Sequence, residues 1–237
     1  MSELYIAYTD TEPELICDNT YSVMYDHYKP GGNLYYFTSS TESVSWTDVI
    51  SDEYAEMKDC QIGWDVTDFG SGDFHKRGLF LMTIRNGCFG KYPKPYAEKI
   101  MVVEEKQVTP MHFHWNKMED IINKGGGNLL IRVYNSTADE DLDKVNDVHV
   151  HLDGREVVVP AGTQVRLTPG ESISIQPYLY HDFEVEKGSG PVLIGEVSQC
   201  NDDNTDNRFY EPIGRFPSIE EDEAPYRLLC NEYPAAK

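Results

Sequence analysis

Basic residues are scarce in this sequence of 237 residues, which has 20 Lys and Arg against 41 Asp and Glu and a formal net charge of −21. A negative surface repels nucleic-acid phosphates and anionic lipid headgroups. We therefore expect neither nucleic acid nor a membrane as a partner. The sequence also lacks an apolar run approaching the roughly 20 residues that span a bilayer. Its first residues lack the basic and apolar segments of a secretory signal, so secretion is not expected.

Cysteines are few as well, and none of the five belongs to a Cys-x-x-Cys pair. An odd, scattered set argues against a disulfide framework and favours reduced thiols in the cytoplasm. The sequence contains no internal repeat and no low-complexity tract. We therefore predict a cytoplasmic protein built around one main domain.

Short apolar runs separated by turn residues dominate the chain from Gly78 onward. Leu79–Ile84, for example, ends at Asn86–Gly87, which is a strong turn pair. Many short strands at close spacing are typical of a β-sandwich or barrel, so we predict a mainly β fold of the jelly-roll kind. The further predicted strands are Lys99–Val103, Thr109–Trp115, Asn128–Tyr134, Asp147–Leu152, Glu156–Val159, Gln164–Leu167, Ser172–Gln176, Asp182–Glu186 and Val192–Val197.

The composition divides the chain into three parts. Residues 1–77 are predicted to form an N-terminal arm, tyrosine-rich over the first ~45 residues, that packs on the barrel or on a second subunit. A short helix is predicted within Ser45–Asp59, where Gly and Pro are absent and Thr47 with Asp48 can cap its start. Residues 78–200 are predicted to form the barrel. Residues 201–237 are acidic and irregular, and we expect them to complete the pocket and the barrel exterior.

A histidine-rich segment predicts a metal site. On a strand, His112 and His114 point to the same face, because side chains alternate with a period of two. Glu119 is far enough along the chain to return on the next strand after a turn. Two imidazoles and a carboxylate on one sheet face suit a divalent first-row metal such as Mn, Fe, Co, Ni or Zn. We expect His181 to supply a fourth ligand from the opposite wall of the barrel.

A second segment, with His149, His151 and Glu156, repeats the same spacing. Its Asp153–Gly154 turn predicts a two-residue hairpin in which His151 lies opposite Glu156 as an ordinary exposed pair. Spacing alone does not distinguish the two segments. The first is favoured because large aromatic and sulfur side chains surround its histidines, namely Met111, Phe113 and Trp115.

Both metal-site segments match known motifs. His112-x-His114-x4-Glu119, followed by Gly126, resembles the first cupin motif, and Gly170 through Pro177 to His181 resembles the second. Longer strings are similar to the cupin-type D-lyxose isomerases between about Gly63 and Tyr233. These strings are Gly63–Thr67, Tyr96–Met101, Val108–Trp115, Glu119–Asn123, Gly125–Leu129, Gly195–Ser198 and Leu228–Tyr233.

The resemblance implies a cupin-type jelly-roll barrel with a short helical N-terminal arm and a metal-dependent aldose–ketose isomerase activity. The family interconverts D-lyxose and D-xylulose, and often D-mannose and D-fructose. Mn²⁺ is typically its preferred metal, and a homodimer is common. The family pattern uses the His112 segment, which implies that His112, His114, Glu119 and His181 are the ligands. The expected partner is therefore a small aldose or ketose sugar.

The resemblance and the local pattern both assign chemistry to Lys99 and Lys117. In a protein this acidic, a lysine two residues before Glu119 is a candidate for binding sugar hydroxyls or a developing oxyanion. Glu196 would point into the barrel if its neighbours faced outward, and we predict that it is the general base. The same three side chains are expected to contact substrate.

The polar segment after Gln199 offers amides and carboxylates that can bind pairs of sugar hydroxyls. Asp202 and Arg215 are predicted to bind substrate from this segment. Two other functions remain open: an Fe²⁺-dependent cupin dioxygenase and a non-catalytic carbohydrate-binding cupin. The lysines near the metal ligands and the polar segment favour the isomerase, since a ring-cleaving oxygenase should have a more apolar pocket.

Overall fold

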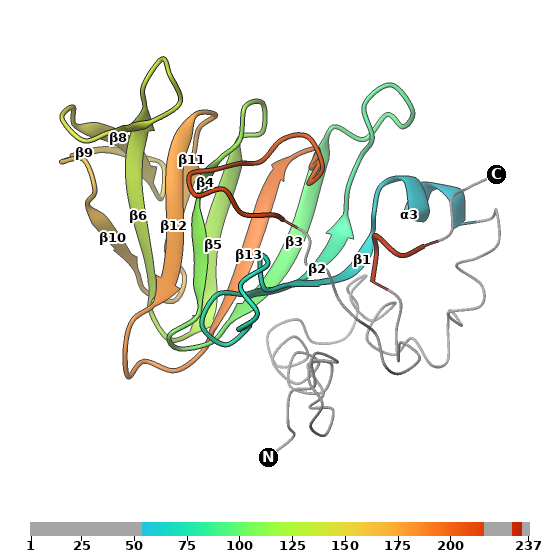
Figure 1. Ribbon diagram of the computed structural model, residues 1–237, viewed down its shortest axis with the longest axis horizontal. Helices are drawn as coiled ribbons and strands as arrows, with labels where there is room; N and C mark the ends of the chain where they lie inside the picture. The colour runs from blue at the N-terminus through green and yellow to red at the C-terminus, as the bar shows by residue number, and fades with distance from the viewer. Residues whose placement is uncertain (1–53, 216–228, 234–237) are drawn as a thin grey trace.

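The computed structural model describes residues 54–215 and 229–233, and in this part of the chain two antiparallel sheets curl around a common core (Figure 1). The larger sheet has eight strands. Their order is β1 (Gly63–Thr67), β2 (Leu79–Arg85), β3 (Tyr96–Val103), β13 (Val192–Gln199), β5 (Glu119–Gly126), β11 (Ser172–Ile175), β8 (Val148–Leu152) and β9 (Arg155–Val159).

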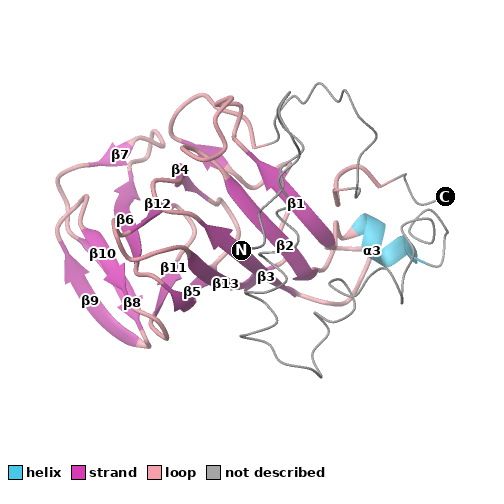
Figure 2. Cartoon of the chain, turned by 90° about the horizontal axis from the view of Figure 1, so that it is seen from below, coloured by secondary structure: helices cyan, strands magenta, loops and turns pink. Residues whose placement is uncertain are grey.

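The smaller sheet has six strands. Five of them follow the order β10 (Gln164–Leu167), β6 (Leu129–Ser136), β12 (Leu179–Val185), β4 (Val108–Phe113) and β14 (Arg208–Phe209), and β7 (Leu142–Asp143) pairs with β6. The one helix among the described residues, α3 (Ala55–Asp59), lies beside the β1 end of the larger sheet (Figure 2). It has five residues, and no helix in the described ranges is long and apolar enough to cross a membrane.

The main core lies between the two sheets, where burial alternates along strands such as β5, β6, β10 and β11, and a second buried cluster includes residues of β1, β2 and β3. In β6, Leu129, Ile131 and Val133 are fully buried while the residues between them are partly exposed. Each buried side chain of this size stabilises the fold by roughly 1.5–3 kcal/mol relative to exposure. A polar residue at one of these inward-facing strand positions therefore has its side chain inside the barrel.

Each of the ten predicted strands coincides with an observed strand, with ends that differ by up to three residues. The Asp153–Gly154 hairpin is confirmed: both residues have positive φ, at 48° and 77°, as a type I′ turn requires, and His151 is opposite Glu156. Four strands were missed, namely β1, β5, β7 and β14. Two of them have only two residues, and β5 ends in glycines that obscure its pattern.

The predicted arm is described only in part. The tyrosine-rich first ~45 residues and the start of the predicted helix, with Thr47 and Asp48, lie outside the described residues. Within the arm, Ala55–Asp59 is helical, and Gly63–Thr67 is strand β1, an edge strand hydrogen-bonded to β2. The larger sheet therefore begins before residue 78.

Candidate active site

Three buried histidines lie together at one end of the barrel. His112 is on β4, His114 follows the end of this strand, and His181 is on the neighbouring strand β12, directly opposite His112. One ring nitrogen of each lies within 4.8 Å of those of the other two. The expectation that His181 comes from the opposite wall is wrong, because β12 is hydrogen-bonded to β4 in the same sheet.

Backbone carbonyls fix the orientation of all three rings. The Nδ1 atoms of His112, His114 and His181 lie 2.8, 2.6 and 3.1 Å from the carbonyl oxygens of Pro110, Asp206 and Leu179. A carbonyl can only accept, so in a neutral ring the proton is on Nδ1 and Nε2 is available as a metal ligand. Burial, followed by the other two histidines, lowers the pKa of His112 well below its usual value. A neutral imidazole with a free Nε2 is the form that binds a metal.

Glu119 faces the histidines from the other sheet, where it is the first residue of β5. Its carboxylate oxygens lie 3.0 Å from Nε2 of His181 and 3.4 Å from Nε2 of His114. Both nitrogens are buried, and neither makes a hydrogen bond of acceptable geometry. Buried polar atoms without partners are rare, and a cation between these nitrogens and the carboxylate would satisfy them. The four residues therefore fit a divalent metal.

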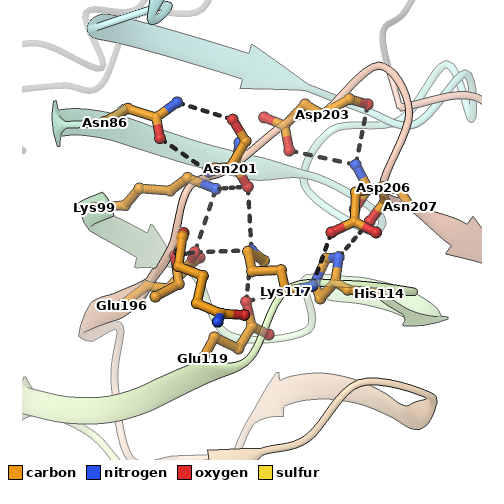
Figure 3. Close-up of polar contacts among 12 residues, drawn as sticks. Asn86, Lys99, His114, Lys117, Glu119, Glu196, Asn201, Asp203, Asp206 and Asn207 are labelled. Atoms are coloured by element: carbon orange, nitrogen blue, oxygen red, sulfur yellow. Dashed lines mark hydrogen bonds and ion pairs between the residues drawn. The ribbon is translucent and has the colours of Figure 1, made fainter. Parts of the chain in front are cut away.

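A lysine–carboxylate network adjoins the histidines (Figure 3). Nζ of Lys117 lies 2.7 Å from Glu119, 2.9 Å from Glu196 and 3.1 Å from Oδ1 of Asn201. Lys99 is opposite Glu196 on the neighbouring strand, and its Nζ donates to the same Asn201 oxygen at 2.7 Å. Glu196 is 5% exposed and Val197 is 45% exposed, whereas Gly195, the other neighbour expected to face outward, is buried. The structure thus brings both predicted lysines and the predicted base together beside Glu119.

The network is charged although it is buried. Burial alone would raise the pKa of Glu196, but Lys117 and Lys99 outweigh it and hold this pKa below the usual value. Burial would lower the pKa of Lys117, but Glu119 and Glu196 raise it above its usual value. At neutral pH the pair is therefore an ionised carboxylate beside an ammonium group.

The segment after Gln199 closes the cavity that these groups line. Arg215 lies in the cavity wall with its side chain 8% exposed, between the carboxylates of Asp65 and Asp203. Asp202 is exposed; its carboxylate accepts hydrogen bonds from Asn204 and Thr205 and is not part of the wall. The structure therefore brings Arg215 to the cavity, together with Asp203 in place of Asp202.

Several residues of the site were missed in the sequence. Asn201 joins the two lysines, and Asn86 in turn holds Asn201, since its amide donates to the Asn201 carbonyl and accepts from the Asn201 backbone N–H. Asp206 supplies the carbonyl that orients His114. Only the excess of Asp and Asn in 201–207 indicated this segment, and composition does not distinguish inward from outward side chains.

The alternative histidine segment lies elsewhere. His149 is 62% exposed at its side chain and pairs with Glu156, which is 59% exposed. His149 and His151 belong to no cluster of potential metal ligands among the described residues. The preference for the His112 segment is therefore supported by burial and by geometry.

Fold and site together define a cupin-type β-barrel with a buried histidine-rich centre of the kind that binds a metal. A model of the D-lyxose isomerase family matches residues 33–233, and the chain belongs to this family, whose members are sugar isomerases. It is 52% identical over 190 residues to a D-lyxose/D-mannose isomerase of Serratia proteamaculans, a match that covers 79% of this chain and 83% of the relative. A relative of the same name from Escherichia coli O157:H7 is 48% identical over 197 residues, which is 82% of this chain and 86% of the relative. The crystal structure of Cellulomonas parahominis L-ribose isomerase with L-psicose overlaps with a TM-score of 0.48 at 13% identity, covering 73% of this chain and 96% of that one.

Proposed function

We propose that this protein is a metal-dependent aldose–ketose isomerase that interconverts D-lyxose with D-xylulose and D-mannose with D-fructose. The observation that carries the proposal is the buried Lys117–Glu196 pair, 2.9 Å apart, beside the three-histidine cluster. The names of the curated relatives support the two aldoses as substrates. The expected homodimer and cytoplasmic location remain predictions.

The metal would be held by His112, His114, His181 and Glu119. Bound there, a divalent ion supplies a Lewis acid and a template for the two oxygens at C1 and C2 of the sugar. The unpaired Nε2 atoms of two of these histidines support this placement. Mn²⁺ is the proposed metal because it is typical of the family that the sequence resembles.

The proton transfers are assigned to the lysine–carboxylate network. Isomerisation of an aldose breaks the C2–H bond, forms a C1–H bond and moves the hydroxyl proton from O2 to O1. Glu196 is ionised, so it can accept the proton from C2 and return it to C1. The ammonium group of Lys117 can donate a hydrogen bond to the oxygen that gains negative charge. Nζ of Lys99 contacts the same Glu196 carboxylate and Asn201 amide oxygen as Lys117 does. Lys99 therefore helps to hold the Lys117–Glu196 pair in place.

Arg215 and Asp203 are proposed to bind some of the remaining sugar hydroxyls. Arg215 offers fixed N–H donors and Asp203 a carboxylate acceptor, and both line the cavity. Burial would raise the pKa of Asp203, but Arg215, Lys99 and Lys117 lower it well below the usual value. The carboxylate therefore remains an acceptor at neutral pH. Asp202, which is exposed, is not part of this proposal.

An anaerobic metal-replacement assay tests the function. The protein is stripped with a chelator, Mn²⁺ is restored without oxygen, and D-lyxose and D-mannose are assayed for ketose formation. The proposal expects turnover that depends on added metal and is independent of oxygen. Oxygen consumption with an aromatic substrate would instead indicate a dioxygenase, and saturable sugar binding without ketose formation would indicate a non-catalytic binding protein.

A further inference from the structure

Thr109 presents an unpaired hydroxyl to the cavity. Its side chain is buried, with 2% of the residue exposed, and Oγ1 makes no hydrogen bond. Every other polar side chain in the described part of the cavity wall has at least one partner. The cavity wall also contains apolar side chains, including those of Phe69, Leu79, Leu81, Phe183 and Phe209, and Phe183 is the cross-strand partner of Thr109. A buried hydroxyl without a partner is destabilising unless a bound molecule satisfies it.

A β-bulge turns this hydroxyl inward. His112 is paired with His181, whereas Thr109 is paired with Phe183, so two residues of β4 lie opposite the single residue Asp182. In a regular strand, residues three apart point to opposite faces. The extra residue, at Pro110–Met111, lets Thr109 and His112 face the same interior. Bulges of this kind re-aim side chains next to functional sites.

We propose that Thr109 is a specificity-determining residue whose Oγ1 binds a sugar hydroxyl beyond C2. The inference rests on the proposed function, in which O1 and O2 lie at the histidine cluster. Because Thr109 and His112 are neighbours on one face of β4, a sugar whose C1 end is at the histidines can extend its further hydroxyls towards Thr109. Oγ1 has no other hydrogen-bond partner, so the hydrogen bond to the sugar is lost without replacement when either hydroxyl is removed.

The test replaces the hydroxyl by a methyl group of nearly the same shape. Thr109→Val keeps the β-branched side chain, and Thr109→Ser restores the hydroxyl. We expect Thr109→Val to unfold in the metal-free, sugar-free state at the same or a higher Tm than the wild type. Its kcat/KM on D-lyxose should fall about tenfold, the effect of about 1.4 kcal/mol. Thr109→Ser should recover most of this loss.

Sugar analogues locate the contact. The loss caused by Thr109→Val is measured on D-lyxose and on derivatives that lack the hydroxyl at C3, C4 or C5. We expect the loss to disappear for the one derivative that lacks the bound hydroxyl, as in a double-mutant cycle. Thr67→Val is the matched control for stability, since the Thr67 hydroxyl donates to the Arg215 carbonyl at 2.6 Å and accepts from the Phe69 N–H at 2.9 Å. Thr67→Val should therefore lower the Tm.

The outcomes separate this inference from the function on which it rests. Absence of aldose turnover by the metal-loaded wild type overturns both. Wild-type turnover with an unchanged kcat/KM in Thr109→Val overturns the inference alone. A lower Tm for Thr109→Val, with an equal loss on D-lyxose and all three derivatives, would assign the hydroxyl a structural role and would also overturn it.

Discussion

The backbone carbonyl of Asp206 accepts a hydrogen bond from Nδ1 of His114 at 2.6 Å, across 92 residues of sequence. The carboxylate of the same aspartate accepts the backbone N–H groups of Asn116 and Lys117 at 2.9 and 3.0 Å. One residue of the segment after Gln199 thus fixes both a proposed metal ligand and the start of the loop that carries Lys117. Asp206 therefore links the proposed metal centre to the proton-transfer network.

Asp206→Ala should weaken metal binding. The substitution leaves two N–H groups without their acceptor and loosens the carbonyl that orients His114. Loss of such a supporting contact typically costs 10–100-fold in metal affinity or activity, and we expect about tenfold in Mn²⁺ affinity. Mn²⁺ titration followed by electron paramagnetic resonance measures this change. Asp143→Ala is a matched control, because Asp143, the last residue of β7, also accepts two consecutive backbone N–H groups, those of the exposed residues Val145 and Asn146. Equal Mn²⁺ affinity in the two variants would contradict the role given to Asp206.

Substitution of single histidines should show which of the two segments with the same spacing, that of His112 or that of His149, binds the metal. His112→Ala or His181→Ala removes one of the converging nitrogens, so we expect the purified protein to lose bound metal and aldose turnover. His149→Ala removes an exposed ring and should retain both. Metal content by mass spectrometry and a ketose assay give the result. Full metal content in His181→Ala, or loss of metal in His149→Ala, would show that the ligands are misassigned.

Glu196→Gln should slow the chemical step. The amide keeps the shape of the side chain but cannot accept a proton, and general base catalysis typically contributes 10²–10⁴-fold to the rate. We expect kcat to fall at least about a hundredfold. Stopped-flow or single-turnover measurement at saturating sugar would show this loss. Glu98→Gln is the control, since Glu98 lies on the neighbouring strand β3 and pairs with Arg85 outside the proposed network. An unchanged kcat in Glu196→Gln would exclude this residue as the base.

The native thiols should differ in reactivity with pH. Burial raises the pKa of Cys60 to about 11, so about one molecule in a thousand carries its thiolate at pH 8. Burial also raises the pKa values of Cys200 and Cys230, while Cys88 is only half-buried. Among these four cysteines we expect iodoacetamide at pH 8 to label Cys88 first, with labelling of Cys60 increasing steeply towards pH 11. Peptide mass spectrometry of protein labelled at several pH values measures the order. Early labelling of Cys60 at pH 8 would contradict its burial.

Local sequence patterns predicted the parts of the fold that depend on neighbouring residues. The period of two placed His112 and His114 on one face, and the Asp153–Gly154 turn fixed the pairing of His151 with Glu156. These features follow from backbone stereochemistry within a few residues. The inward direction of Glu196 was predicted in the same way, whereas the choice of the His112 segment depended on its aromatic and sulfur neighbours and on the family resemblance.

The segment after Gln199 shows where local sequence patterns fail to predict side-chain direction. Asp202 and Asp203 are adjacent and chemically identical, yet only Asp203 lines the cavity and contacts Arg215. The direction of each side chain depends on how an irregular segment packs on the barrel. No periodicity describes an irregular segment, so the sequence could not distinguish the two residues.

By itself, the sequence determined that this protein is a β-barrel with a pair of histidines on one strand face, and the matching strings indicated its family. Only the tertiary structure decided that His181 is the neighbour of His112 and that Glu119 approaches from the other sheet. Tertiary structure likewise decided that the bulge in β4 turns Thr109 into the cavity. The physical reason is that residue alternation is a local property of the chain. The order in which strands pair instead depends on burying the whole core at once.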